Sequence, residues 1–153
     1  MKKYLAIITW TIISLVLVCF IFSNSFACKE VSIELSRGIT DLLYDCVKSI
    51  LKLSFDEFHG LVRKVAHFVE FALFGASVWM TMDSARNLGR RFNVETVLFL
   101  SLTVAVIDEF IQSFTGRGSA VGDVILDFAG ALFGIVITAV IIHLANRKKQ
   151  PSN

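Results

Sequence analysis

The sequence predicts an all-α fold, a four-helix transmembrane bundle with an extracytoplasmic amphipathic helix between the first and second spans. Hydrophobic residues make up 55% of the 153 residues, charged residues make up 18%, and there is a single proline. The apolar residues gather in four stretches, at about 4–22, 65–82, 94–114 and 121–144. A soluble bundle needs a polar face at helical spacing, and these stretches have none over most of their length. The composition also excludes a disordered chain and indicates one membrane domain over residues 1–153.

Each span is supported by its own residues. The first, from Tyr4 to Phe22, is nineteen residues without a charge, which as a helix is roughly 28 Å, close to the thickness of a bilayer core. The second is interrupted by His67 and Glu70. The third carries acidic residues near both ends and the fourth carries them near its start, so polar groups enter three of the four spans.

Basic residues at the span ends predict that both termini are cytoplasmic. These residues are Lys2, Lys3, Arg86, Arg90, Arg91, Arg147, Lys148 and Lys149. They fall on one side of a four-span chain and make residues 145–153 a basic cytoplasmic tail, with segment 23–64 outside. A second interpretation of the N-terminus is a signal peptide cleaved at Ala27, although the apolar run is longer than usual for one.

The outer segment, residues 23–64, is expected to contain the amphipathic helix. Its apolar residues recur at helical spacing: Leu35, Ile39, Leu42, Cys46, Val47 and Ile50. Ser54 and Glu57 form a capping box, which predicts a new helix beginning near Phe55. Cys28 and Cys46 can pair if this segment is extracytoplasmic, and the sequence leaves that pairing open.

The ionisable residues inside the spans are predicted to lie at one depth. Each costs about 2.5–3.5 kcal/mol at the centre of a membrane helix, so their number needs a reason. At about 1.5 Å per residue, Glu70 lies about 9 Å below an outer boundary at Lys64, and Asp108 about 9 Å below the same boundary. Asp123 lies near the boundary and Asp127 about 6 Å deeper. Hydropathy alone set the spans, so this agreement predicts a shared polar recess that opens to the exterior.

The faces of the helices support this recess. His67 shares a helical face with Lys64 and Glu70, and Asp108 shares one with Gln112. Below Asp127, Gly130 and Gly134 form a GxxxG motif, which predicts close helix contact and offers one route to a homo-oligomer.

The recess holds an acid, base and cation set. The candidate catalytic residues are His67, Glu70, Asp108, Glu109, Gln112 and Asp123, and the candidate substrate-binding residues are Lys64, Arg117 and Asp127. The five carboxylates oppose three cations, Arg63, Lys64 and Arg117. They cannot all stay charged in a dry pocket, so the pocket is wet, some carboxylates are protonated, or a cation is bound. Histidine with carboxylates is compatible with a divalent metal, and the cofactor otherwise stays open. In a second interpretation Glu109 faces solvent in the outer connection.

These residues carry a resemblance to a known family. The runs KVAHFVEF at 64–71 and LFG at 73–75 are similar to the first signature of VanZ-like membrane proteins. The runs DEFIQSF at 108–114, GR at 116–117 and DV at 123–124, with Gly130, resemble the second. Asp127 and Thr115 depart from the family, which often has Asn and Pro there. The resemblance implies a multi-pass protein of the bacterial cell membrane, in a family whose founding member is associated with resistance to the lipoglycopeptide teicoplanin.

Three functions are compatible with the sequence. The first is an enzyme acting on a lipid headgroup or a lipid-linked envelope intermediate. The second is a non-catalytic protein that binds a lipid or a lipoglycopeptide, and the third, less favoured because the acids stop near one surface, is a proton-coupled transporter. The cluster can also be structural, as hydrogen bonds that join helices. Membrane lipids are the expected partners, and the net charge of +2 does not suggest nucleic acid.

Overall fold

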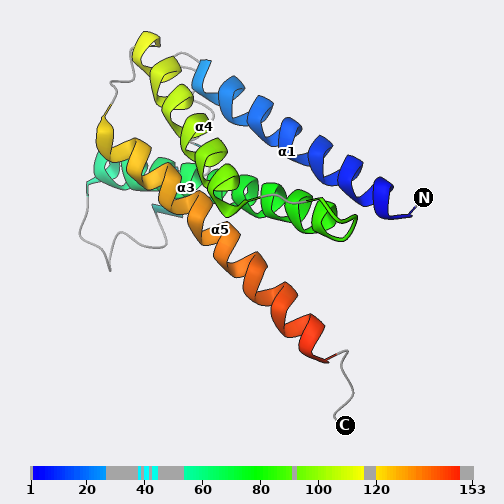
Figure 1. Ribbon diagram of the computed structural model, residues 1–153. Coiled ribbons are helices and arrows are strands. Elements are labelled where there is room, and N and C mark those ends of the chain that lie inside the picture. Colours follow the sequence, from blue (N-terminus) through cyan, green and yellow to red (C-terminus); the bar gives the residue numbers. More distant parts are fainter. Residues whose placement is uncertain are drawn as a thin grey trace.

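The computed structural model describes residues 2–26, 38, 40, 41, 43, 44, 54–90, 93–115 and 120–148. Within these residues the protein contains the long helices α1 (Lys2–Phe26), α3 (Phe55–Arg86), α4 (Val94–Phe114) and α5 (Val121–Lys148), with no strand (Figure 1). Each helix contains one of the four apolar stretches, and the bounds of α4 coincide with the predicted ones. The all-α prediction is therefore confirmed.

Three of these helices are long and apolar enough to cross a membrane: Tyr4–Phe26, Phe55–Arg86 and Val121–Arg147. The prediction of apolar spans is confirmed for these three, whereas α4 is a helix of the expected length that is not among them. Large apolar side chains cover the outside of the bundle, including Leu15 at 60% exposure and Phe99 at 70%. Such a surface is far more apolar than that of a soluble protein, and it is suited to contact with lipid. The protein is a multi-pass membrane protein.

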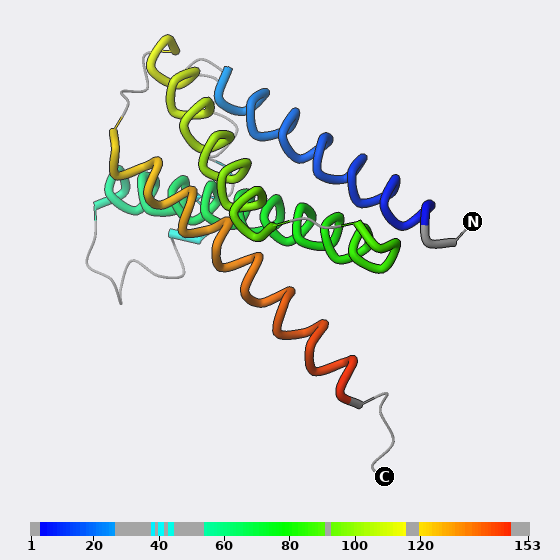
Figure 2. Tube along the Cα trace, viewed as in Figure 1, coloured from blue at the N-terminus to red at the C-terminus, as the bar shows by residue number. Residues whose placement is uncertain are grey.

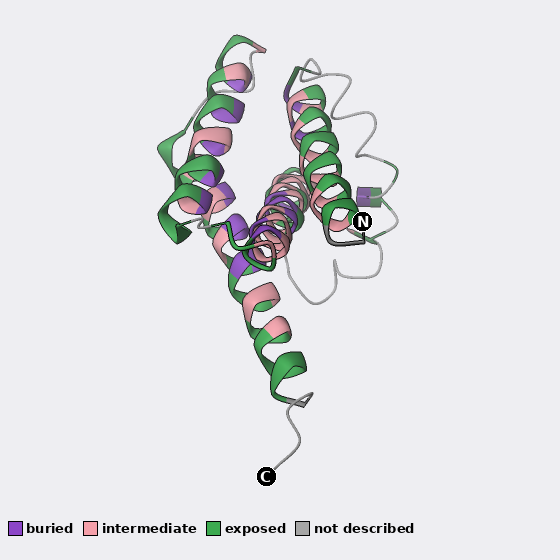
Figure 3. Ribbon diagram, turned by 45° about the vertical axis from the view of Figure 1, so that its right-hand side comes forward, coloured by how far each residue is buried: buried purple, intermediate pink, exposed green. Residues whose placement is uncertain are grey.

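Helix α3 lies at the centre and packs against α1, α4 and α5 (Figure 2). Its Phe71 and Phe74 form a buried core with Ile21, Ala105 and Ala131 of the surrounding helices. Further along, the Ser14 and Ser77 hydroxyls of α1 and α3 are hydrogen-bonded at 2.9 Å. Buried residues lie where the helices face one another, and exposed residues face outward (Figure 3).

Glycines allow α3 and α5 to cross with their backbones in contact. A Cβ atom added to Gly134 would overlap the backbone oxygen of Ala72, and one added to Gly130 would lie 2.5 Å from the oxygen of Phe68. The predicted close contact at the GxxxG motif is confirmed, and its partner is α3 of the same chain. The face is therefore occupied by α3 within the chain.

The start of α3 is set by its cap. Ser54 accepts a hydrogen bond from the Glu57 backbone N–H, and the Glu57 carboxylate accepts one from the Ser54 backbone N–H at 2.9 Å. The predicted capping box is thereby confirmed. The predicted amphipathic helix lies largely outside the described residues, as does the pairing of Cys28 with Cys46. Tyr44, which is described, packs its ring against those of Phe55 and Phe58.

Candidate functional site

Asp108 is fully buried on α4 and is held by two donors. The Ser25 hydroxyl of α1 donates to its Oδ1 at 2.5 Å, and the Gln112 amide donates to its Oδ2 at 2.7 Å. Gln112 also donates to the Ser25 oxygen at 3.3 Å. These bonds fix the plane of the carboxylate, and the i, i+4 spacing on α4 places Asp108 and Gln112 together as predicted.

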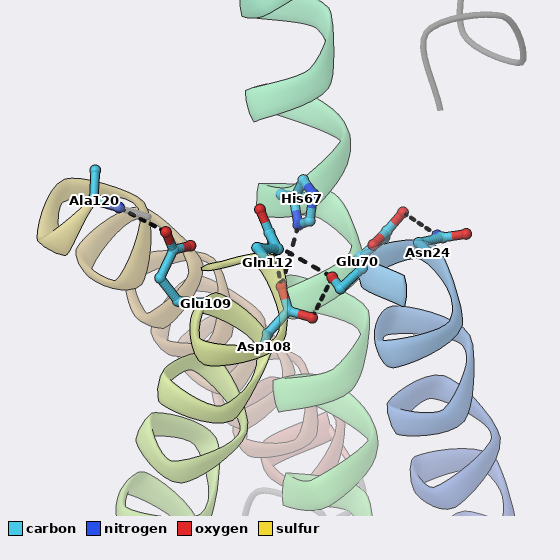
Figure 4. Close-up of polar contacts among 8 residues, drawn as sticks. Asn24, His67, Glu70, Asp108, Glu109, Gln112 and Ala120 are labelled. Atoms are coloured by element: carbon cyan, nitrogen blue, oxygen red, sulfur yellow. Dashed lines mark hydrogen bonds and ion pairs between the residues drawn. The ribbon is translucent and has the colours of Figure 1, made fainter. Parts of the chain in front are cut away.

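Two further helices bring ionisable groups to Asp108. The Nδ1 atom of His67 on α3 lies 3.8 Å from Asp108 Oδ2, and the imidazole faces the carboxylate (Figure 4). Asp127 on α5 is 2% exposed. One nitrogen of His67 and one oxygen from each of Asp108 and Asp127 lie within 4.8 Å of one another. We call these three residues the His-Asp-Asp cluster.

A small cavity of about 20 Å³ opens beside the cluster. It has room for about one water molecule. Its lining residues are Arg63, Lys64, His67, Gln112, Asp123, Leu126 and Asp127. The Lys64 ammonium lies 3.7 Å from Asp123 Oδ1, and the Lys64 side chain is 61% exposed. Lys64 and Asp123 thus stand at the exposed side of a cavity whose inner residues include the buried Asp127.

Glu70 points away from Lys64 and His67, the residues with which it was predicted to share a helical face. Its Oε1 atom accepts a hydrogen bond from the Asn24 side chain of α1 at 3.2 Å (Figure 4). It is absent from the cavity lining formed by the described residues. His67 and Lys64 face the cavity, whereas Glu70 is directed toward α1.

Glu109 lies apart from the cavity, at the connection between α4 and α5. Its side chain accepts a hydrogen bond from the Ala120 backbone N–H at 2.6 Å (Figure 4). The residue is only 5% exposed. The interpretation that Glu109 faces solvent is therefore wrong, because it binds the backbone that leads into α5. Its other oxygen, Oε2, has no hydrogen-bond partner in the described part of the chain.

The remaining predicted residue, Arg117, lies outside the described residues. Among those described, Asp127 also has a carboxylate oxygen, Oδ2, that is buried and accepts no hydrogen bond. An unsatisfied carboxylate oxygen is costly away from water, so Asp127 marks the place where a ligand is most favourable.

Two residues of the site, Asn24 and Ser25, were not predicted. They belong to the polar run Ser23-Asn24-Ser25, which directly follows the last apolar residue of the first span. The structure continues α1 through this run, so both side chains reach the level of the cluster. The available signal was a polar triplet directly after the first span, which the prediction placed outside the membrane. Cleavage at Ala27 would remove both residues.

The arrangement offers a proton acceptor, a metal-ligand set and an anion site within one region. His67 and Asp127 line the cavity and can take a proton from water or bind a cation. Arg63 and Lys64 line the same cavity and can bind an anionic oxygen.

Comparison with protein-family models identifies a family to which the chain is similar. The model of the VanZ/LLP1 family matches residues 10–143. Neither the curated proteins nor the solved structures give a match. The matched range contains all of the described site residues, from Asn24 to Asp127. It covers most of the chain, and the protein therefore belongs to the VanZ/LLP1 family.

Proposed function

We propose that the protein is an enzyme that acts on the headgroup of a membrane lipid, or of a lipid-linked envelope intermediate, at the outer membrane surface. The reaction class is hydrolysis or group transfer. The observation that carries this proposal is the His-Asp-Asp cluster, in which residues from α3, α4 and α5 meet beside a cavity lined by Arg63 and Lys64.

The distribution of basic residues supports an outward position for the cluster. The cluster lies toward the start of α3 and α5 and toward the end of α4. The opposite ends carry Lys2 on α1, Arg86 on α3 and Arg147 on α5. Basic residues favour the cytoplasmic side of a span, and this supports a position of the cluster near the outer surface. Arg86 also stacks over Trp79 at 5.5 Å, which suits a side chain at a membrane boundary.

The chemistry follows from the lining of the cavity. The Lys64 side chain is 61% exposed, and an anionic phosphate would compete with Asp123 for its ammonium. The cluster would activate a water molecule or a hydroxyl group next to that phosphate. The activated oxygen attacks the phosphorus atom and forms a new P–O bond, and the P–O bond to the leaving oxygen breaks. The proton taken from the attacking group is passed to the leaving oxygen.

A purely structural cluster explains these contacts less well. Polar groups that only join helices gain stability by satisfying one another's hydrogen bonds. Within the described residues the buried Asp127 Oδ2 and Glu109 Oε2 atoms have no such partner. Burial without a partner costs about 1–3 kcal/mol for a polar group and more for a charged one. Asp127 in particular therefore contributes little to joining the helices, and its position favours a role in binding a ligand.

The proposal is tested by mass spectrometry of envelope lipids. Cells that lack the gene receive the wild-type chain, Asp108→Asn or Asp127→Asn, with Asp56→Asn as a matched control because Asp56 is exposed and outside the cluster. We expect a lipid species that changes with the wild type and the control, and does not change with either cluster variant at equal protein level. Full retention of the change in both cluster variants contradicts the proposal.

The same experiment separates catalysis from binding. If the lipids are identical with and without the gene, while teicoplanin is retained in a manner that depends on Lys64 and Asp127, the protein is a binding protein and the enzymatic proposal is wrong. Teicoplanin susceptibility, measured in parallel, shows whether either activity protects the cell.

A further inference from the structure

We propose that His67, Asp108 and Asp127 bind one divalent transition-metal ion, of the Zn²⁺ or Mn²⁺ type, at the wall of the cavity. This inference adds a cofactor to the proposed function, and the importance of the site rests on that function. Binding of the ion can nevertheless be measured without any substrate.

The positions of the donor atoms support this ion site. One donor atom from each residue lies within 4.8 Å of the others, and His67 Nδ1 lies 3.8 Å from Asp108 Oδ2. Bonds from Zn²⁺ to nitrogen or oxygen are about 2.0–2.2 Å, so two ligands of one tetrahedral ion lie about 3.3–3.6 Å apart. The His67–Asp108 pair already has nearly this spacing, and the set as a whole must contract around an ion.

Asp127 gives the second, independent observation. It is 2% exposed, its Oδ2 atom has no hydrogen-bond partner among the described residues, and it lines the cavity together with His67. The cavity volume of about 20 Å³ is too small for a lipid headgroup, but it suits a single water molecule or ion. A buried carboxyl oxygen without a partner, beside a space of this size, is the environment that a small cation stabilises.

The surroundings of Asp108 are those of an oriented ligand. Ser25 and Gln112 hold its carboxylate from α1 and α4. Metal-ligating carboxylates are typically held by hydrogen bonds of this kind, which fix their direction. Ser25 and Gln112 are therefore positioning residues in this proposal.

Charge and donor type indicate the class of ion. Two carboxylates and a neutral imidazole balance a divalent cation, which resolves the excess of acids around the cavity. Calcium and magnesium prefer oxygen donors alone, whereas an imidazole nitrogen with carboxylates favours Zn²⁺ or Mn²⁺. Three protein ligands leave a coordination position for water, as in catalytic zinc sites. The bound ion would acidify that water and so supply the nucleophile of the proposed reaction.

The experiment uses the full chain purified in detergent and stripped with a chelator. ZnCl₂ and MnCl₂ are then added separately, and bound metal is counted by mass spectrometry while affinity is measured by calorimetry. We expect one ion per chain for at least one metal. His67→Ala and Asp127→Asn should weaken binding at least about tenfold, and Ser25→Ala about 10–100-fold, the usual effect of losing an outer-shell partner.

Matched controls separate this site from adventitious binding. His143→Ala removes an exposed histidine near the other end of α5, and Asp56→Asn removes an exposed carboxylate at the start of α3. Both should bind as the wild type does. If a cluster variant fails to fold, X-ray absorption of the zinc-loaded wild type still decides, because the proposal requires one imidazole, oxygen ligands and no sulfur.

Three results overturn the inference: no ion on the wild type, unchanged affinity in both His67→Ala and Asp127→Asn, or sulfur in the zinc shell. If the wild type binds no metal but Asp108→Asn loses the lipid change, the proposed function stands and the ion inference is wrong. If the wild type binds metal but the cluster variants keep full lipid activity, the ion inference stands and the proposed function is wrong.

Discussion

At the scale of single residues, Asp108 shows how a membrane protein stabilises a buried carboxylate. It receives hydrogen bonds from Ser25 and Gln112 and faces His67, so contacts from three helices replace its hydration. Hydrogen bonds to charged groups contribute about 1.5–3 kcal/mol each, and leaving the acceptor unsatisfied costs at least as much. Ser25 should therefore matter for stability although it carries no charge.

Ser25→Ala is expected to lower the free energy of unfolding by about 1.5–3 kcal/mol, because Asp108 stays buried with one donor fewer. Thermal unfolding in detergent measures the effect. Ser23→Ala is the control, since the Ser23 hydroxyl is exposed and donates to the Cys19 backbone oxygen of its own helix. Equal stability of the two variants would show that the Ser25 contact is not important for folding.

The sequence predicted the charged members of the site better than the neutral ones. Asp108, Gln112, His67 and Asp127 could be found because an ionisable or amide group in an apolar stretch is conspicuous and helical spacing fixes its face. Ser25 could not, since a serine is common at a helix end and its role appears only once α1 and α4 are packed together. The orientation of Glu109 was missed for a similar reason, because its partner is a backbone N–H.

At the scale of elements, hydropathy predicted where the helices lie, and local chemistry set where they begin. Helix α4 begins and ends at the limits of the third apolar stretch, Val94 and Phe114. Helix α3 begins directly after its N-terminal cap, Ser54. How the helices pair could be predicted only at the GxxxG motif, because small residues are the one local sign of close contact in a membrane. The central position of α3 depends on side-chain shapes along several helices, which no single stretch reveals.

The crossing of α3 and α5 should be sensitive to one added methyl group. Gly134→Ala places a Cβ against the backbone oxygen of Ala72, so the helices must move apart, at a cost of about 1–3 kcal/mol. Gly122→Ala on the same helix meets nothing within 4 Å and should be neutral or slightly stabilising, because alanine favours a helix. Unfolding curves of both variants measure this. An equally stable Gly134→Ala would contradict the tight crossing.

At the scale of the whole molecule, the polar cluster and the basic helix ends lie at opposite ends of the bundle. This separation predicts an orientation in which both termini are cytoplasmic and residues near Ser54 are outside. It also requires α4 to cross the membrane, because three crossings would leave the termini on opposite sides.

Alkaline phosphatase fusions test this orientation, since the enzyme is active only outside the cytoplasm. A fusion after Ser54 should be active and a fusion at the C-terminus inactive, with a cytoplasmic fluorescent reporter giving the complementary result. An active fusion at the C-terminus would show that α4 does not cross, or that the protein is inserted in the opposite sense.

The cluster should behave as one unit, because residues that act together in catalysis lose nearly the whole effect when any one is removed. The decisive measurement is the rate of lipid change in Asp108→Asn, Asp127→Asn and the double variant, at equal protein level. We expect each single variant to lose most of the rate and the double variant to be no worse than either. Independent, multiplying losses, or a single variant with the wild-type rate, would contradict a shared site.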